Sequence, residues 1–379
     1  MTKAIILSGG YGTRLRPLTC SLPKTLIPVV NVPIIERQMM LLKSIGINEF
    51  ILAVSVMSEY LKGYFGDGSD FKIKIHYTNE KSPLGTAGAL KLAEYHLKDE
   101  NFFMLNGDEI INFDFQKMLD FHKKSSNVVG TIASKKVEET SRYGVLIVDP
   151  ETDRIIQFLE KEEYSPNEGK HIPMPVNAGV YLLEPEVFSY IAPKKKLSIE
   201  RDVFPDLAKE GKLYNYSIEG IWKDIGTPLD LFEGNMMLMR SLIEKSQNKE
   251  ENIVSNTVQF EGNINIIPPV TIGEHAIVHY GCKIGPNAII GNNTYIEKNA
   301  IIRDSIIYDK VFIGENVKLE KAIIADNCRL DENVEIKGNE KGLVILASSV
   351  HILKNIKLIS PDDRHVTYCH HEVVRRSIE

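Results

Sequence analysis

Aliphatic residues recur every six positions through the last third of the chain, and this period constrains the fold more than any other feature. The members of the series are Ile266, Ile272, Val278, Ile284, Ile290, Ile296 and Ile302. Four positions after most of them stands a small residue, as at Ala276, Cys282, Ala288, Thr294 and Ala300. A six-residue period is typical of a parallel β-helix with triangular coils, in which each aliphatic side chain points into the core. The series therefore predicts a left-handed parallel β-helix of hexapeptide repeats over residues 251–340, with a one-residue slip of phase near Tyr308.

Roughly the first 230 residues follow a different pattern, in which short β-branched runs alternate with helical periodicity. Strands are expected at residues 3–8, 50–55, 73–77 and 102–106. A helix is expected at residues 33–45, with Asn31 as its cap and Pro33 in its first turn. Such alternation indicates an α/β fold with a Rossmann-like, mainly parallel sheet covered by helices.

The two patterns predict the division of the chain. An α/β domain is expected over residues 1–245 and includes an amphipathic linker helix that starts near residue 228. The β-helix follows over residues 251–340, and a C-terminal extension over residues 341–379 fits neither pattern. The extension is rich in histidine, but no metal-ligand spacing stands out, so surface histidines are expected there rather than a metal site.

Charge and cysteine usage exclude several classes of protein. The formal net charge of −6 and the pI near 6.0 give no basic stripe for nucleic acid. The four cysteines are scattered and form no CxxC pair, which argues against a zinc site or a disulfide framework. No leader pattern opens the sequence and no apolar run is long enough to span a bilayer. A cytoplasmic protein without a membrane partner is expected.

A glycine-rich loop directly follows the first expected strand. Gly9, Gly10 and Gly12 let backbone N–H groups approach a polyphosphate, and Arg14 and Lys24 supply positive charge nearby. The loop has the spacing of neither the dinucleotide fingerprint nor the P-loop, so a tight turn with solvated basic residues is the alternative. Asp108 also follows a strand, which predicts that it lies on the same rim of the sheet.

The segment from Gly9 to Lys24 resembles the signature of the sugar-1-phosphate nucleotidylyltransferases. The resemblance covers the first 230 residues, because further motifs fall in the family's order: Pro83–Gly88, Gly107-Asp108, Tyr143-Gly144-Val145, Phe158–Lys161, Asn177-Ala178-Gly179, Ser198-Ile199-Glu200 and Trp222–Gly226. Within the family, the chain is most similar to the GDP-mannose pyrophosphorylase branch, whose longer members also carry a β-helix.

The resemblance implies that a sugar 1-phosphate attacks the α-phosphorus of a nucleoside triphosphate and that pyrophosphate leaves. It implies Mg²⁺ as cofactor, with Asp108 and Asp224 as metal ligands, and it makes Arg14 and Lys24 the groups that hold the triphosphate and the attacked phosphate. Mg²⁺ prefers such carboxylates together with phosphates and water. The residues expected to bind the nucleotide are Leu7, Gly9, Gly10, Gly12, Thr13, Glu80, Gly85, Thr86 and Gly107.

The sugar phosphate has its own expected residues. Lys161 would hold its phosphate, and the sugar would contact Tyr143, Gly144, Glu160, Asn177 and Gly179. The sequence departs from the family here, because Glu162-Glu163 replaces the proline that often follows this lysine.

The resemblance places Glu80 where the base edge is read. Guanine offers two neighbouring donors, N1–H and the N2 amino group, and a carboxylate accepts both. Uracil or thymine offers one ring N–H between two carbonyls, which an amide side chain matches better. Glu80 therefore favours GTP, and the resemblance to the GDP-mannose pyrophosphorylase branch implies mannose 1-phosphate as the second substrate.

Three alternatives remain open. The chain is a glucose-1-phosphate uridylyl- or thymidylyltransferase if Glu80 faces solvent, or a catalytically silent regulatory paralogue. It could also carry an acyltransferase site on the β-helix with His279 as a base, although the four or five coils expected from the repeats are few for such a site. The β-helix is more simply expected to mediate a homo-oligomer, because open coil edges need cover.

Overall fold

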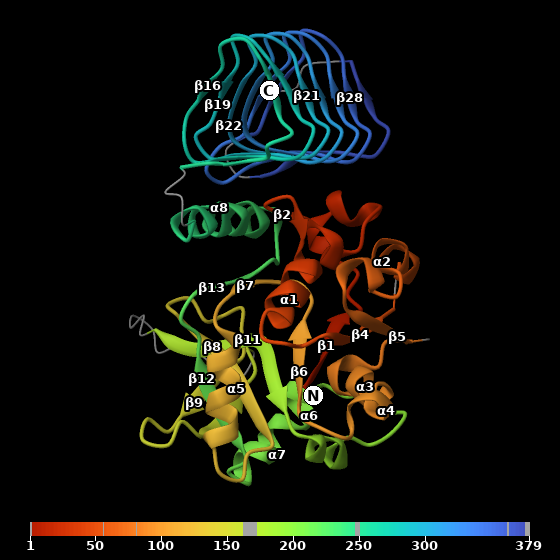
Figure 1. The fold of residues 1–379 in the computed structure, drawn as a ribbon, viewed down its shortest axis with the longest axis vertical. Coiled ribbons are helices and arrows are strands. Elements are labelled where there is room, and N and C mark those ends of the chain that lie inside the picture. The colour runs from red at the N-terminus through yellow and green to blue at the C-terminus, as the bar shows by residue number, and fades with distance from the viewer. Residues whose placement is uncertain are drawn as a thin grey trace. The chain divides into compact units, whose positions relative to one another are not determined.

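A computed structural model describes residues 2–55, 57–80, 82–161, 173–246, 251–361 and 364–375. The chain forms two compact units, drawn in Figure 1. The first unit comprises residues 1–11, 23–26 and 34–224, and the second comprises residues 12–22, 27–33 and 225–379. Among the described helices, none is long and apolar enough to cross a membrane.

The first unit is built on a nine-stranded sheet with the core order β10-β9-β11-β6-β1-β4-β5. The strands β1 (Lys3–Ser8), β4 (Glu49–Val54), β5 (Lys74–Asn79) and β6 (Phe102–Asn106) are parallel, as their sequence spacing predicts. β11 (Met174–Leu183) runs antiparallel to β6 and continues the sheet towards β8 (Gly130–Val137), β9 (Val145–Val148), β10 (Ile155–Leu159) and β12 (Leu213–Ser217). A separate pair, β7 (Glu109–Asn112) and β13 (Ile221–Asp224), is antiparallel.

Each described α-helix of this unit buries at least one apolar side chain. These helices are α1 (Ile34–Lys43), α2 (Ser58–Phe65), α3 (Gly85–Leu92), α4 (Glu94–Leu97), α5 (Phe115–Lys124), α6 (Ile199–Asp202) and α7 (Phe204–Lys209). In α1, Ile34, Ile35, Met39 and Leu42 are fully buried at helical spacing, as the periodicity predicts.

The prediction that Asn31 caps this helix is wrong. Val30 and Asn31 have positive φ angles of 49° and 62° and form the turn of a hairpin between β2 (Pro28–Val29) and β3 (Val32–Pro33). Positive φ at both central residues defines the type of turn that joins twisted strands, and asparagine tolerates it well. The Asn31 side chain donates a hydrogen bond to the carbonyl of Ile290 over 2.7 Å instead of capping α1.

The second unit contains the parallel β-helix, whose stacked coils are visible in Figure 1. One face carries seven strands: β15 (Gln259–Glu261), β18 (Ile277–His279), β21 (Tyr295–Ile296), β23 (Phe312–Ile313), β25 (Arg329–Leu330), β28 (His351–Ile352) and β31 (Val373–Val374). The remaining strands are β14 (Ile253–Val254), β16 (Asn265–Ile266), β17 (Val270–Ile272), β19 (Lys283–Ile284), β20 (Ala288–Ile290), β22 (Ile301–Ile307), β24 (Lys318–Ile324), β26 (Glu335–Lys337), β27 (Val344–Leu346), β29 (Lys357–Ile359) and β30 (Val366–Tyr368).

The six-residue series lines the core of this β-helix. Its members from Ile272 to Ile302 are at most 1% exposed, as are the small residues four positions later. The expected slip is also present. Coils before it repeat every 18 residues, as between Glu274 and Asn292, and coils after it repeat every 17, as between Asn316 and Asn333.

Residues beyond 340 do not form a separate extension in the described part of the chain. β27, β28 and β29 pair in parallel with β24, β25 and β26, and β30 and β31 form the next coil. The spacing between coils lengthens there to 22 residues, as between Asn333 and Asn355, which is why the six-residue period misses them. The expected number of coils is too low for the same reason.

The expected linker helix is α8 (Pro228–Glu244), and it belongs to the second unit. Its Asn235 accepts a hydrogen bond from the backbone N–H of Val30 over 2.8 Å, and its Arg240 donates to Asn287 over 2.9 Å. These bonds join the helix to the hairpin and to the β-helix. The compact units therefore divide the chain elsewhere than at residue 245.

Candidate active site

A cavity of about 380 Å³ opens in the first unit at the carboxyl ends of β1 and β6. Leu7 of β1 pairs with Asn106 of β6, and the N–H of Gly107 donates to the carbonyl of Leu7 over 3.0 Å. The glycine loop and Asp108 therefore meet on one rim, as predicted. The lining residues are Leu7, Ser8, Gly9, Gly10, Lys24, Thr25, Glu80, Pro83, Gly85, Thr86, Ala89, Asn106 and Asp108.

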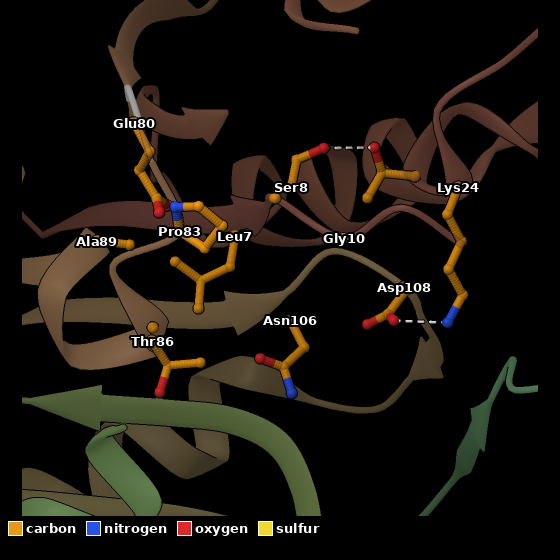
Figure 2. Close-up of a pocket in the computed structure, with 13 residues that line it drawn as sticks. Leu7, Ser8, Gly10, Lys24, Glu80, Pro83, Thr86, Ala89, Asn106 and Asp108 are labelled. Carbon is orange, nitrogen blue, oxygen red and sulfur yellow. Dashed lines mark hydrogen bonds and ion pairs between the residues drawn. The ribbon is translucent and has the colours of Figure 1, made fainter. Parts of the chain in front are cut away.

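Lys24 and Asp108 form an ion pair on the wall of this cavity. Nζ of Lys24 lies 2.6 Å from Oδ2 of Asp108, and Figure 2 shows the pair on one side of Asn106, with Glu80 and Thr86 on the other side. Lys24 starts the short helix η3 (Lys24–Leu26) and is only 8% exposed. A nearly buried ammonium group stays there only with an opposite charge, which Asp108 provides here and a phosphate can also provide.

Glu80 faces the cavity rather than solvent. Its own N–H donates to the carbonyl of Val54 over 3.0 Å, and its Oε2 accepts a hydrogen bond from the N–H of Leu84 over 2.9 Å. The first bond anchors the main chain of Glu80 and the second orients its carboxylate, whose Oε1 lines the side open to a ligand. Lys81, which follows it in the motif, lies outside the described residues.

Two glycines allow the close approach that forms the rim. A Cβ on Gly107 would lie 2.7 Å from the carbonyl oxygen of Leu7 and 2.9 Å from Thr25. Gly85 has a φ of +75°, and a Cβ there would collide with the carbonyl of Leu197. Both residues therefore need to be glycine for steric reasons, as well as for any contact with a ligand.

Three of the expected nucleotide residues are assigned to the second unit. Gly12, Thr13 and Arg14 belong to residues 12–22, where η1 (Thr13–Leu15) begins after Gly12, which has a left-handed φ of 60°. The side chain of Arg14 is exposed. The cavity as described does not include these three residues.

A buried carboxyl group joins the two expected metal ligands, and the sequence analysis missed it. Glu109 follows Asp108 directly and lies in register with Asp224 across the β7–β13 pair. It is buried, which raises its pKa well above the usual range, and the charges of Asp224 and Asp108 raise it further. Its Oε2 has no hydrogen-bond partner among the described residues. The sequence gives one signal of this group, a second acidic residue beside Asp108.

These carboxyl groups fit a divalent cation. After burial, the charges of Asp224 and then Asp108 raise the pKa of Glu109, so both carboxylates oppose its ionisation, and Arg142 lies 3.7 Å from Asp224. A cation between Asp108 and Asp224 would relieve this repulsion. No group of three or more His, Cys, Asp or Glu side chains within the described ranges can hold a metal by itself.

The expected sugar-binding residues also come together. The ring of Tyr143 lies 5.1 Å from the ring of Trp222, and Nε1 of Trp222 donates to the carbonyl of Ala178 over 3.0 Å. The N–H of Asn177 donates to the carbonyl of Gly144 over 2.9 Å. Two residues further on, a Cβ on Gly179 would lie 2.6 Å from the amide of Asn106, which lines the cavity. The turn at Tyr143-Gly144 is therefore bonded to the segment from Asn177 to Gly179, and Gly179 adjoins the cavity wall at Asn106.

Glu160 and Lys161 follow β10. Glu160 lies 3.8 Å from Arg201, and Lys161 is exposed. The departure at Glu162-Glu163 lies outside the described residues.

Three histidines of the β-helix have hydrogen-bonding or ion-pair partners. His279 contacts Tyr295 and Glu261 over 2.6 and 2.8 Å. His351 contacts Asp331 over 2.9 Å, and His365 accepts a hydrogen bond from the N–H of Leu343.

Comparison with known proteins decides the family. The profile of the Nucleotidyl transferase family matches residues 3–241, which include the whole cavity. The chain belongs to the nucleotidyl transferases. A second profile, the GMPPB C-terminal domain, matches residues 266–378 of this nucleotidyl transferase and thus extends over the late coils.

Several curated relatives are named as mannose-1-phosphate guanylyltransferases or guanyltransferases. Mannose-1-phosphate guanylyltransferase 1 of Arabidopsis thaliana is 38% identical over 299 residues, which cover 78% of each chain. Mannose-1-phosphate guanyltransferase of Saccharomyces cerevisiae is 42% identical over 267 residues, which cover 68% of this nucleotidyl transferase and 71% of the yeast protein. Mannose-1-phosphate guanylyltransferase catalytic subunit beta of Danio rerio is 40% identical over 276 residues, covering 72% and 73%.

Solved structures agree on the first unit. A putative glucose-1-phosphate thymidylyltransferase from Bacillus anthracis matches 65% of this nucleotidyl transferase and 97% of its own length, with a TM-score of 0.56 and 27% identity. HddC from Yersinia pseudotuberculosis, in complex with GMP-PN, matches 62% and 98%, with a TM-score of 0.52 and 26% identity.

Proposed function

We propose that this nucleotidyl transferase joins GTP to mannose 1-phosphate, forming GDP-mannose and releasing pyrophosphate. The observation that carries the proposal is the position of Glu80, whose carboxylate lines the cavity and is oriented by the N–H of Leu84. A fixed carboxylate pairs with the two adjacent donors of guanine and with no corresponding pair on uracil or thymine. The names of the curated relatives support the same base and the same sugar.

The reaction brings two anions together, so the protein must supply positive charge and orientation. An oxygen of mannose 1-phosphate attacks the α-phosphorus of GTP, and pyrophosphate leaves in line. This oxygen is already anionic at neutral pH, and the reaction therefore needs no general base. Lys24, nearly buried on the cavity wall, would stabilise the charge that builds on the attacked phosphate.

Two further cations are assigned by family resemblance alone. Arg14 would hold the triphosphate and stabilise the departing pyrophosphate, and Lys161 would hold the phosphate of the sugar. Both side chains are exposed, which leaves them accessible to anionic substrates.

Mg²⁺ is the proposed cofactor. Asp108 and Asp224 would hold it, and the cation would neutralise phosphate charge. Lys24 also contacts Asp108, so its charge lies next to the proposed cation site.

A matrix of substrates tests the proposal. Pyrophosphate release is measured with magnesium for GTP, UTP, dTTP, ATP and CTP, each with mannose 1-phosphate and with glucose 1-phosphate. Preference for GTP with mannose 1-phosphate is expected. Turnover of UTP or dTTP with glucose 1-phosphate would overturn the base assignment, and no turnover by the folded protein would favour a silent regulatory paralogue. The homo-oligomer expected from the β-helix remains a prediction, which light scattering of the same preparation tests.

A further inference from the structure

A chain of hydrogen bonds connects the nucleotide cavity with the segment proposed to bind the sugar, and Glu200 lies at its centre. Oε2 of Glu200 accepts from the hydroxyls of Thr86 and Ser198, each over 2.6 Å. Oε1 accepts from the hydroxyl of Tyr181 over 3.2 Å. Tyr181 in turn accepts from Nδ2 of Asn177 over 2.8 Å. Thr86 lines the cavity, so the chain begins at the nucleotide end.

The direction of every bond in this chain is determined. Each of the three hydroxyls accepts a hydrogen bond from a group that can only donate: Thr86 from the N–H of Ile199, Ser198 from the N–H of Arg201, and Tyr181 from the amide nitrogen of Asn177. An ionised carboxylate can only accept, so each hydroxyl donates its own proton to Glu200. A carboxylate can accept all three, because its two oxygens offer about four lone pairs.

Asn177 is fixed independently at the far end. Its Oδ1 accepts from the backbone N–H of Gly179 over 3.0 Å, so its Nδ2 is the atom that faces Tyr181. Tyr181 is fully buried, and burial, with the charge of Glu200 as the next cause, raises the pKa of its hydroxyl well above the usual range. The hydroxyl therefore keeps its proton. Because it donates this proton to Glu200, it accepts a hydrogen bond from Asn177. Among the described residues, one N–H and one lone pair of the Asn177 amide remain for a ligand.

We propose that Glu200 is a positioning residue, which sets the direction of the hydrogen bonds from Thr86 to Asn177 and so fixes the amide edge that meets the sugar. The inference rests on the proposed function, because it takes mannose 1-phosphate as the substrate and takes the sugar role of Asn177 from the family resemblance. Glutamine at position 200 cannot accept all three protons. In one orientation of the glutamine amide, its oxygen accepts from Thr86 and Ser198, and its amino group faces the hydroxyl of Tyr181, which also needs an acceptor. In the opposite orientation, the amino group faces the hydroxyls of Thr86 and Ser198, which both need an acceptor.

Tyr181→Phe tests the inference most selectively, since it removes the link to Asn177 and leaves Glu200 charged. The KM for mannose 1-phosphate is expected to rise about ten-fold, with kcat and the KM for GTP changed by less than about two-fold. Glu200→Gln also disturbs Thr86 and is expected to raise both KM values about ten-fold.

Tyr214→Phe is the matched control. Tyr214 is buried in the same sheet, and its hydroxyl donates to the carbonyl of Ser126 over 2.8 Å and accepts from Arg154 over 3.0 Å. Like Tyr181→Phe, the Tyr214→Phe variant loses one donated and one accepted hydrogen bond, but at a site outside the cavity. Thermal unfolding of all three variants separates a loss of stability from a loss of positioning.

The outcomes are distinct. A selective rise in the KM for mannose 1-phosphate in Tyr181→Phe, absent in Tyr214→Phe, supports the inference. An unchanged KM in Tyr181→Phe, or an equal rise in the control, overturns it. If the wild-type protein itself does not use GTP and mannose 1-phosphate, the proposed function fails instead.

Discussion

Glu80→Gln is expected to abolish the recognition of the guanine amino group. The N–H of Leu84 can only donate, so it orients the glutamine with its oxygen towards Leu84 and its amino group towards the base. That amino group would face the N1–H and N2 amino donors of guanine. The variant thus loses charge-assisted hydrogen bonds and places donor against donor.

The loss can be estimated per bond. A hydrogen bond to a charged group contributes about 1.5–3 kcal/mol, which corresponds to roughly a ten- to hundred-fold fall in kcat/KM with GTP. ITP, which lacks the N2 amino group, reports the contact separately. We expect the wild-type protein to prefer GTP over ITP by about ten-fold and the variant to show a ratio near one.

Steady-state pyrophosphate release with both nucleotides gives this ratio. Glu59→Gln, a change in an exposed helical glutamate outside the cavity, is the control and should leave the ratio unchanged. A GTP-to-ITP preference that survives in Glu80→Gln would refute the assignment of Glu80 to the base.

Three further predictions concern stability, pH and metal. Gly107→Ala forces a Cβ to within 2.7 Å of the Leu7 carbonyl oxygen and should lower the free energy of unfolding by about 1–3 kcal/mol. Gly63→Ala, in α2 with open space around it in the described part of the chain, should raise it by about 0.5–1 kcal/mol, and equal effects in urea denaturation would contradict this. Burial lowers the pKa of His122, so the unfolded chain takes up a proton first as pH falls below about 6.5, and stability falls with it. His122→Gln should flatten that loss between about pH 7 and about pH 5, and equal slopes would refute the cause. EDTA should abolish turnover, and Asp224→Asn should raise the magnesium concentration needed for half-maximal rate, whereas an unchanged requirement would remove Asp224 from the metal site.

Much of the fold follows from local pattern. Ile5 and Ile51 lie in short buried runs of neighbouring parallel strands, and the residues from Ile272 to Ile302 keep one spacing through successive coils. Such regularity leaves few alternatives, because burial on both faces of a strand and at each corner of a coil demands apolar side chains.

The errors share a physical cause, which is dependence on distant contacts. Asparagine is a common helix cap, but the side chain of Asn31 donates a hydrogen bond to the carbonyl of Ile290 instead. The connection between β26 and β27, from Gly338 onwards, is longer than the earlier corners of the β-helix. The six-residue period does not continue through it, so the sequence gives no sign of the coils that follow.

The site was predictable where a motif stands alone and unpredictable where residues meet through the fold. Lys24 and Asp108 were both expected, and the structure adds their ion pair. The buried state of Glu109 and the bonds of Glu200 depend on strands far apart in the sequence. A sequence alone does not show which distant residues come together in the fold, so it reveals neither of these features.

The fate of the phosphorus atoms tests the central claim most directly. The folded protein is incubated with magnesium, mannose 1-phosphate and GTP labelled at either the α- or the γ-phosphorus, and the products are separated. Nucleotidyl transfer predicts that the α label appears in GDP-mannose and the γ label in pyrophosphate. A γ label on the sugar product, or an α label that stays in free GTP or GDP, would contradict the account.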